Sequence, residues 1–200
     1  MRPVIARYVP SLLRISALGA LLVPLASCTA TTAGQSSSFV MIQALRAASG
    51  AEPGTFGGTL ASDVLTKASI YADPAQVVFS LALKDQTGLE PTANNFVTFN
   101  RYRVTYIRSD GRNTPGVDVP YAFDGGLTVT VTDQPVTAAF ELVRIQSKLE
   151  NPLLPLVGMG GALAISTIAE VTFYGADQTG REVSATGRIS VTFADWGDPE

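Results

Sequence analysis

Apolar and polar side chains alternate along much of the chain after residue 38, which is the pattern of half-buried β-strands. The run from Gln76 to Lys84 shows it well. Its apolar face carries Val77, Phe79, Leu81 and Leu83. In the longer run from Phe96 to Arg108, Tyr102, Val104 and Tyr106 share one face and Arg101, Arg103 and Thr105 share the other. Both runs predict strands with one side in a core.

Further segments rich in Val, Ile, Phe, Tyr and Thr predict strands. They are Phe39–Leu45, Val117–Phe123, Leu127–Thr132, Val136–Gln146, Ala164–Tyr174 and Glu182–Ala194. Clusters of Gly, Pro, Asp and Asn separate them and predict turns. Such clusters are Asp110-Gly111, Asp124-Gly125-Gly126 and Asp133-Gln134-Pro135. We expect Asp73-Pro74 to stop a strand begun at Ile70, and Leu60–Lys67 to be a short helix or an irregular crossing.

About seven to nine short strands with close turns and almost no helical period predict an all-β fold, a two-sheet antiparallel immunoglobulin-like sandwich. The closing hairpin EVTFYGADQTGREVSATGRISVTF resembles that of bacterial immunoglobulin-like and fibronectin-like domains. The Cys–Trp–Cys pattern of antibody domains is missing, and the resemblance implies no activity. We predict burial of Phe79, Leu81, Tyr102, Val104, Phe140, Leu142, Phe173 and Ile189.

The start of the chain has a different pattern. Arg2, Arg7 and Arg14 occur without acidic residues, and the apolar run Ile15–Ser27 follows. Basic residues, a short apolar run and small residues are the order of a secretory signal peptide. A membrane-spanning helix needs roughly 20 apolar residues, so this run favours a signal peptide over a permanent span.

Cys28 is the single cysteine of the chain. The residues Leu25-Ala26-Ser27-Cys28 resemble the lipobox of bacterial lipoprotein precursors. That resemblance implies cleavage before Cys28, a covalent diacylglyceryl lipid on its thiol and acylation, typically with palmitate, of the new amino end. The alternative is an ordinary signal peptide with a chance cysteine. We expect no other cofactor.

The predicted organisation is a signal peptide over residues 1–27, a lipidated cysteine and flexible tether over residues 28–38, and a β-sandwich domain over residues 39–200. The tether is rich in Thr, Ala, Gly and Ser, which cannot bury enough apolar surface to fold alone. Several uncharacterised bacterial lipoproteins look like this. The resemblance implies a membrane-anchored protein facing the periplasm or cell surface. Thr29, where an Asp would retain an enterobacterial lipoprotein in the inner membrane, favours the outer membrane in a Gram-negative bacterium.

Charge and composition exclude several function classes. Three of the 14 basic residues lie in 1–27, so 11 remain against 17 Asp and Glu, which argues against nucleic-acid binding. The chain has no histidine, which removes Ser-His-Asp and Cys-His catalysis and His-ligated metals. Carboxylate, Lys or Tyr chemistry and oxygen-ligated Ca²⁺ or Mg²⁺ stay open. Ser-Lys catalysis has no support, because Ser62 and Lys67 lack S-x-x-K spacing and Ser147 and Lys148 are adjacent.

Two sets of residues are candidates for binding. A candidate anion contact is formed by Arg101, Arg103, Arg108 and Arg112. The alternative is a solvated sheet face whose arginines pair with acids across strands. A candidate partner loop carries Leu153, Leu154, Leu156, Val157 and Met159. The alternative there is a loop that caps the core.

Acidic residues cluster loosely at Asp118, Asp124 and Asp133 and at Asp195, Asp198 and Glu200. Their spacing matches neither an EF-hand nor a nonapeptide calcium repeat, so solvated turns are the simpler interpretation. The sequence therefore favours a lipid-anchored, non-catalytic binding or assembly module of the cell envelope, with an envelope protein as partner. A carboxylate-dependent glycan hydrolase and a small-ligand carrier are the alternatives.

Overall fold

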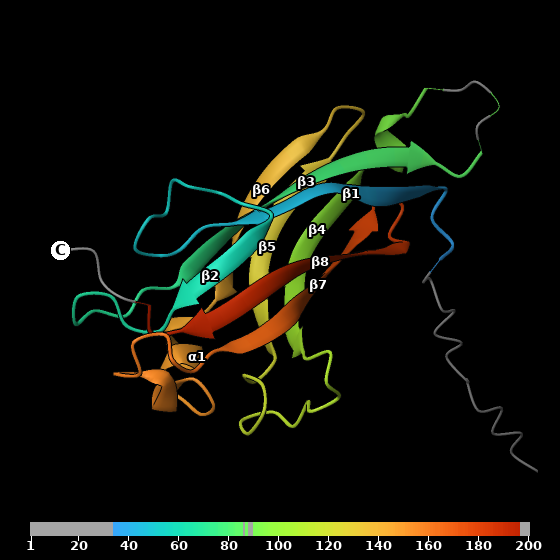
Figure 1. The fold of residues 1–200 in the computed structure, drawn as a ribbon. Helices are drawn as coiled ribbons and strands as arrows, with labels where there is room; N and C mark the ends of the chain where they lie inside the picture. The colour runs from blue at the N-terminus through green and yellow to red at the C-terminus, as the bar shows by residue number, and fades with distance from the viewer. Residues whose placement is uncertain (1–33, 86, 88–89, 197–200) are drawn as a thin grey trace, which may run out of the picture. The chain divides into compact units, whose positions relative to one another are not determined.

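Eight β-strands form two sheets in the computed structural model, which describes residues 34–85, 87 and 90–196 (Figure 1). The smaller sheet has the order β1 (Ser38–Ala47), β3 (Asp73–Leu83), β6 (Val136–Val143). The larger sheet has the order β2 (Thr59–Asp63), β8 (Glu182–Ala194), β7 (Ile165–Asp177), β4 (Val97–Ile107), β5 (Phe123–Val131). The helical turns η1 (Ala93–Asn95), α1 (Ile145–Lys148) and η2 (Leu154–Leu156) lie in connections. The predicted all-β class with two sheets is confirmed.

Pairing is antiparallel except between β2 and β8, which run parallel from Thr59↔Ser190 to Asp63↔Ala194. The larger sheet is curled, and the smaller sheet lies against its inner face (Figure 1). The pairing of β4 shifts register between Phe99 and Arg101 on both sides: Asn100 is an extra residue opposite β7, and β5 has an extra residue opposite β4. A bulge increases strand twist and bends the strand, which suits a curled sheet.

Aromatic rings fill the space between the sheets. Phe79 of β3 contacts Phe99 of β4 and Phe173 of β7, with both ring centroids 4.9 Å away. Phe140 of β6 meets Tyr102 of β4 at 5.1 Å and Phe173 at 5.3 Å. The two sheets therefore share one core, built from the apolar faces that alternation predicts.

The predicted strand phases are confirmed. Of the eight residues expected in the core, seven are buried and Leu81 is partly buried against the same cluster. On β4, Tyr102, Val104 and Tyr106 face the core, and Arg101 and Arg103 face solvent. The last hairpin is also confirmed, with β7 and β8 in register from Ile165↔Phe193 to Ala176↔Glu182.

Two local predictions near β2 and β3 are wrong. Thr59–Asp63 is a strand rather than a helix or an irregular crossing, because β8 offers it a parallel partner far along the chain. Asp73-Pro74 begins β3 rather than stopping an earlier strand. A register shift lies between these two residues in the pairing of β3 with β6. Proline is tolerated at the start of a strand and at bulges, because no ladder donor is lost there.

Three predictions between β4 and β7 are also wrong. Asp124-Gly125-Gly126 is no turn and lies within β5, where Gly125 leaves room for a ring: a Cβ there would meet Cζ of Tyr102 at 2.2 Å. Residues 117–122 are no strand, because the amides of Val117 and Asp118 bond back to the carbonyl of Thr114. β6 ends at Val143, before α1 begins.

Candidate functional site

The strand register places the start of β1, here called the chain entry, and the β6–β7 connection at opposite ends of the fold. Ser38 at the start of β1 pairs with Leu83 at the end of β3. Asp73 at the start of β3 pairs with Val143, which precedes α1. Figure 1 shows the same arrangement, with α1 far from the beginning of β1. The ten residues of β1 span roughly 33 Å at 3.3 Å per residue.

The connection from Ile145 to Leu163, here called the apolar segment, has a buried and an exposed side. Leu153 and Leu156 are 0% and 4% exposed and belong to the core. Val157 packs partly buried against that core. Leu154 and Met159 are 47% and 45% exposed. The candidate partner loop thus divides: three of its members cover the core, and two present apolar surface to solvent.

The rest of the apolar segment adds to that exposed surface. Ile145 and Leu149 lie at either end of α1 and are each 45% exposed, and Leu163 is 54% exposed. Residues four apart on a helical turn share a side, so Ile145 and Leu149 face the same way. Five large apolar side chains are exposed on one connection of 19 residues. We call them the apolar patch: Ile145, Leu149, Leu154, Met159 and Leu163.

A buried ion pair holds α1 against the sheets. Nζ of Lys148 lies 3.0 Å from both Oδ1 and Oδ2 of Asp73, and both side chains are 1% exposed. Oγ of Ser62 on β2 donates to Oδ2 at 2.6 Å, and the amide of Gly50 donates to Oδ1 at 2.8 Å. Burial raises the pKa of Asp73, although Lys148 and these hydrogen bonds oppose the shift.

Sequence reasoning missed this cluster. Ser62, Asp73 and Lys148 lie on β2, β3 and α1, and the ion-pair partners are 75 positions apart in the chain. The sequence pattern predicts Asp73 at the end of a strand and gives no reason to bury Lys148, since lysine is rarely buried unless it is paired. No local pattern brings the three residues together, because the pairing of distant strands creates the site.

A second contact fixes the far part of the apolar segment. The amide of Gly158 donates to Oδ2 of Asp195, and the ring of Trp196 lies near Gly161. Oδ1 of Asp63 accepts a hydrogen bond of 3.0 Å from the amide of Trp196. The segment is therefore held by Lys148 on one side and by Asp195 on the other.

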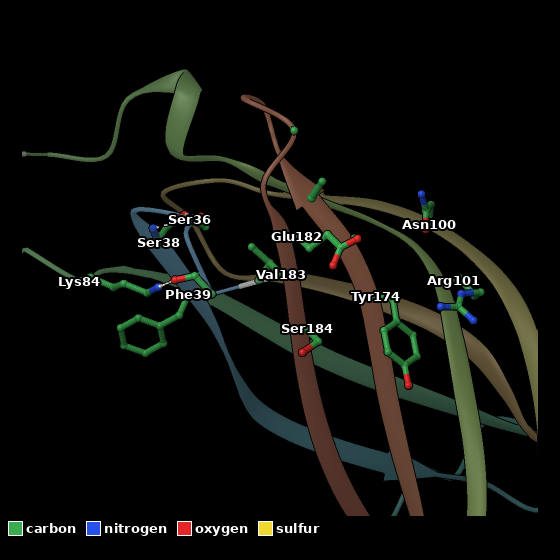
Figure 2. Close-up of a pocket in the computed structure, with 14 residues that line it drawn as sticks. Ser36, Ser38, Phe39, Lys84, Asn100, Arg101, Tyr174, Glu182, Val183 and Ser184 are labelled. Carbon is green, nitrogen blue, oxygen red and sulfur yellow. Dashed lines mark hydrogen bonds between the residues drawn. The ribbon is translucent and has the colours of Figure 1, made fainter. Parts of the chain in front are cut away.

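A groove of about 820 Å³ lies at the opposite end, where the chain enters (Figure 2). Figure 2 shows Arg101, Tyr174 and Ser184 on adjacent strands, with Phe39 and Lys84 across from them. The guanidinium of Arg101 stacks on the ring of Tyr174, 4.3 Å from its centroid. Nζ of Lys84 donates to the carbonyl of Gly34 at 2.7 Å. Both cations of the groove thus already have partners within the chain.

The four candidate arginines form two pairs. Arg101 and Arg103 share Asp124 of the neighbouring strand, at 3.4 Å and 2.8 Å. Arg108 and Arg112 share Asp110, at 2.6 Å and 3.1 Å. Hydrogen bonds from Arg108 and Arg112 hold the pKa of Asp110 well below its usual range. Binding of an external anion stays a prediction, and such an anion would have to displace a carboxylate.

The acidic residues do not form one cluster. Asp124 binds the two arginines, Asp118 accepts from the amide of Thr114, and Asp195 accepts from Gly158. Asp198 and Glu200 lie outside the described residues. Among residues 34–85, 87 and 90–196, no group of three or more acidic or cysteine side chains is placed to hold a metal ion.

The lipobox, Cys28 and most of the tether also lie outside the described residues. Ser38 at the start of β1 bonds to the carbonyl of Asn95 at 2.7 Å.

In the part of the chain that the structure describes, no helix combines the length and the apolar character needed to cross a bilayer.

No protein-family model, no curated protein sequence and no solved structure matches this chain.

Proposed function

We propose that this protein is a lipid-anchored, non-catalytic binding module of the bacterial cell envelope. In this proposal the apolar patch is its contact surface for an envelope protein. The observation that carries the proposal is the exposure of five large apolar side chains on one connection, at the end of the fold opposite to the chain entry. Exposed apolar surface gathered in one place is typical of an interaction site.

The proposed fold is an immunoglobulin-like sandwich. Support comes from the strand order. One sheet has the order β1, β3, β6, and the other contains the neighbours β8, β7, β4 and β5 in that order. This is the order A-B-E and G-F-C-C′ of immunoglobulin-like domains. The fold departs from the standard pattern at β2, which adds a parallel strand to β8. It departs again between β5 and β6, where residues 132–135 leave no room for a strand D.

Position relative to the anchor favours a protein over the anchoring membrane as the occupant of the patch. A lipid on Cys28 would attach the domain through the Ser38 end of β1. Residues 34–38 already bond to the domain through Lys84 and Asn95, so the chain from Cys28 to Gly34 could span at most about 20 Å. The apolar patch lies at the other end of the strands, roughly 30 Å further on by the length of β1. The lipid would therefore hold the patch away from the bilayer, toward other envelope components.

The groove gives little support for the glycan hydrolase. Two facing carboxylates are needed for that chemistry, and Glu182 is the single carboxylate among the residues that line the groove. The small-ligand carrier needs an enclosed cavity between the sheets, and aromatic rings in contact occupy the space between β3, β4, β6 and β7. The proposed role therefore involves recognition without a reaction.

The experiment that tests the proposal is site-specific photo-crosslinking of the full chain in native membranes. A photoreactive residue at Met159 should give one discrete protein adduct. Met41 on β1 is the matched control, because its side chain is equally exposed at 45% and lies near the chain entry. The Met159 adduct should be lost with Leu154→Ser and retained with Met41→Ser. The Cys28→Ser variant, which cannot carry the lipid, should give less adduct.

Two results would overturn the proposal. One is the same adduct from probes at Met41 and Met159, which would show proximity without a specific surface. The other is a Met159 adduct with lipid alone, which would show that the patch contacts the membrane.

A further inference from the structure

The first part of β8 has an edge without a strand partner. β2 pairs with β8 only from Ser190 to Ala194. Within the described part of the chain, residues 182–189 therefore have β7 on one side and no strand on the other. Figure 1 shows β2 beside the end of β8 and not beside its beginning. We call residues 182–189 the free edge, and such an edge can pair with a further strand.

Every second residue of the free edge points its backbone groups to the open side. The carbonyl of Ala194 accepts a hydrogen bond of 3.0 Å from the amide of Val64, just after β2. Backbone groups of a strand point to its two sides in alternation, and β8 pairs with β7 without a register shift. The side that Ala194 faces is therefore also faced by the even-numbered residues before it. Beyond the reach of β2, these are Glu182, Ser184, Thr186 and Arg188.

Open space and partly covered apolar side chains lie beside the free edge. The groove at the chain entry is lined by Ser184 of β8 and, across from it, by Phe39 of β1 (Figure 2). Further along, a Cβ at Gly187 would meet Cδ1 of Ile42 at 3.0 Å and Cδ2 of Leu45 at 3.3 Å. Ile42 and Leu45 are only partly buried. A strand added at the free edge would therefore cover apolar surface as well as bond to the backbone.

The free edge is complementary to a second copy of itself. In an antiparallel pair with a two-fold axis at Ala185, Glu182 lies opposite Arg188 of the second copy, and the reverse holds by symmetry. Ser184 lies opposite Thr186 in the same way. The backbone groups of these four residues point to the open side, so each of these pairs is of the hydrogen-bonded kind. One register thus supplies a continuous ladder and two ion pairs.

Both charged side chains can take part in these ion pairs. Glu182 is exposed, and the side chain of Arg188 is 68% exposed. Arg188 bonds to Glu170 of β7 through Nε at 2.8 Å and Nη2 at 2.7 Å. A guanidinium has five N–H donors, so Arg188 can hold Glu170 and a second carboxylate at the same time.

We propose that two copies of the protein form a symmetric dimer in which their free edges pair antiparallel about Ala185. The two larger sheets then become one continuous sheet. The inference goes beyond the proposed function, because it concerns a different surface. The apolar patch of each copy lies at the end of the fold opposite to the groove, so it stays available in the dimer.

Charge reversal tests the dimer. The purified full-length protein should sediment as a dimer in detergent solution. Glu182→Arg should raise the dissociation constant of the dimer at least about tenfold, because two like-charged pairs replace two ion pairs. Glu182→Arg/Arg188→Glu should restore the dimer, because the opposite charges return with their positions exchanged. Glu141→Arg, the same change at an exposed position of β6, is the matched control and should leave the dissociation constant unchanged.

Disulfide trapping tests the register. The variants are made in the full chain with Cys28→Ser, so that the introduced cysteine is the single one. Ala185→Cys should give a disulfide-linked dimer, because residue 185 faces itself across the axis with Cα atoms about 4.5 Å apart. Ser184→Cys is the control. Its two Cα atoms would lie on the order of 8 Å apart, which is too far for a disulfide.

Three results would overturn the proposal. The first is a wild-type protein that stays monomeric up to its solubility limit. The second is a dimer whose dissociation constant Glu182→Arg does not raise. The third is an equal yield of linked dimer from Ser184→Cys and Ala185→Cys, because random collisions would then explain both.

Discussion

The ring of Phe173 on β7 meets the ring of Phe79 on β3 edge to face, with centroids 4.9 Å apart and an interplanar angle of 89°. The two residues belong to different sheets, and both are fully buried. This contact joins the curled sheet to the smaller sheet at the centre of the core.

Phe173→Ala should therefore weaken the whole fold. We expect a loss of about 3–5 kcal/mol in the free energy of unfolding, because the change leaves a cavity that several rings line. Urea denaturation followed by circular dichroism measures it. Ile168→Ala, on the same strand with a 39% exposed side chain, is the control and should cost much less. Equal losses for the two variants would contradict the assigned core.

Gly175→Ala should be strongly destabilising. A Cβ at Gly175 would meet the carbonyl oxygen of Thr98 at 2.1 Å, and that oxygen belongs to backbone next to the bulge of β4. The strands would have to move apart there. Gly126→Ala on β5 is the control, because nothing lies within 4 Å of a Cβ at that position. Thermal unfolding should show a clearly lower midpoint for Gly175→Ala and little change for Gly126→Ala.

Lys148→Met should cost about 3–5 kcal/mol, because it leaves the carboxyl group of Asp73 buried without its cation. The double variant Lys148→Met/Asp73→Asn should be less destabilised. The oxygen of its neutral amide can still accept from the amide of Gly50, its nitrogen can donate to the hydroxyl of Ser62, and no unpaired charge remains. Urea denaturation at pH 7 compares the two. A double variant that is weaker than Lys148→Met would show that charge pairing is not the reason for the loss.

Stability should fall in acid partly through Asp177. Burial by itself would raise the pKa of Asp177, but bonds from the hydroxyl of Thr179 and from the amides of Thr179 and Arg181 lower it to about 2, against 3.8 in the unfolded chain. A group with a depressed folded pKa stabilises the fold above its unfolded pKa, and that contribution disappears as the pH falls through the folded pKa. The loss attributable to Asp177 therefore lies between about pH 4 and pH 2.

Asp177→Asn tests this dependence. The variant should lose less stability than the wild type over that pH range, in urea denaturation at several pH values. Asp124→Asn is a useful comparison, since Asp124 is an exposed strand residue whose partners are also exposed. If the free energy of unfolding of Asp177→Asn depends on pH as it does in the wild type, another carboxyl group causes the loss of stability in acid.

Sequence patterns alone predicted the all-β class and most strand phases correctly. Alternation over Gln76–Lys84 and Phe96–Arg108 assigned the correct face of β3 and β4 to the core, because side chains of a strand point to opposite sides in turn. Residues with ordinary turn chemistry, such as Asp110-Gly111, were also identified correctly. The sequence also located part of the candidate site, because the candidate partner loop from Leu153 to Met159 lies in the apolar segment, but it did not show which of the leucines are exposed.

The features that the patterns missed depend on contacts between distant segments. Thr59–Asp63 is a strand because β8 provides a partner, and Gly125 lies within a strand because the ring of Tyr102 occupies the space of its side chain. Leu153 is buried and Leu154 exposed because only the former packs on the core, and the preceding α1 is tied to β3 by Lys148 and Asp73, which are 75 residues apart. Local patterns report the preferences of neighbouring residues. A buried charge is tolerated only where distant segments bring it a partner, so the pair emerges only when the sheets are assembled.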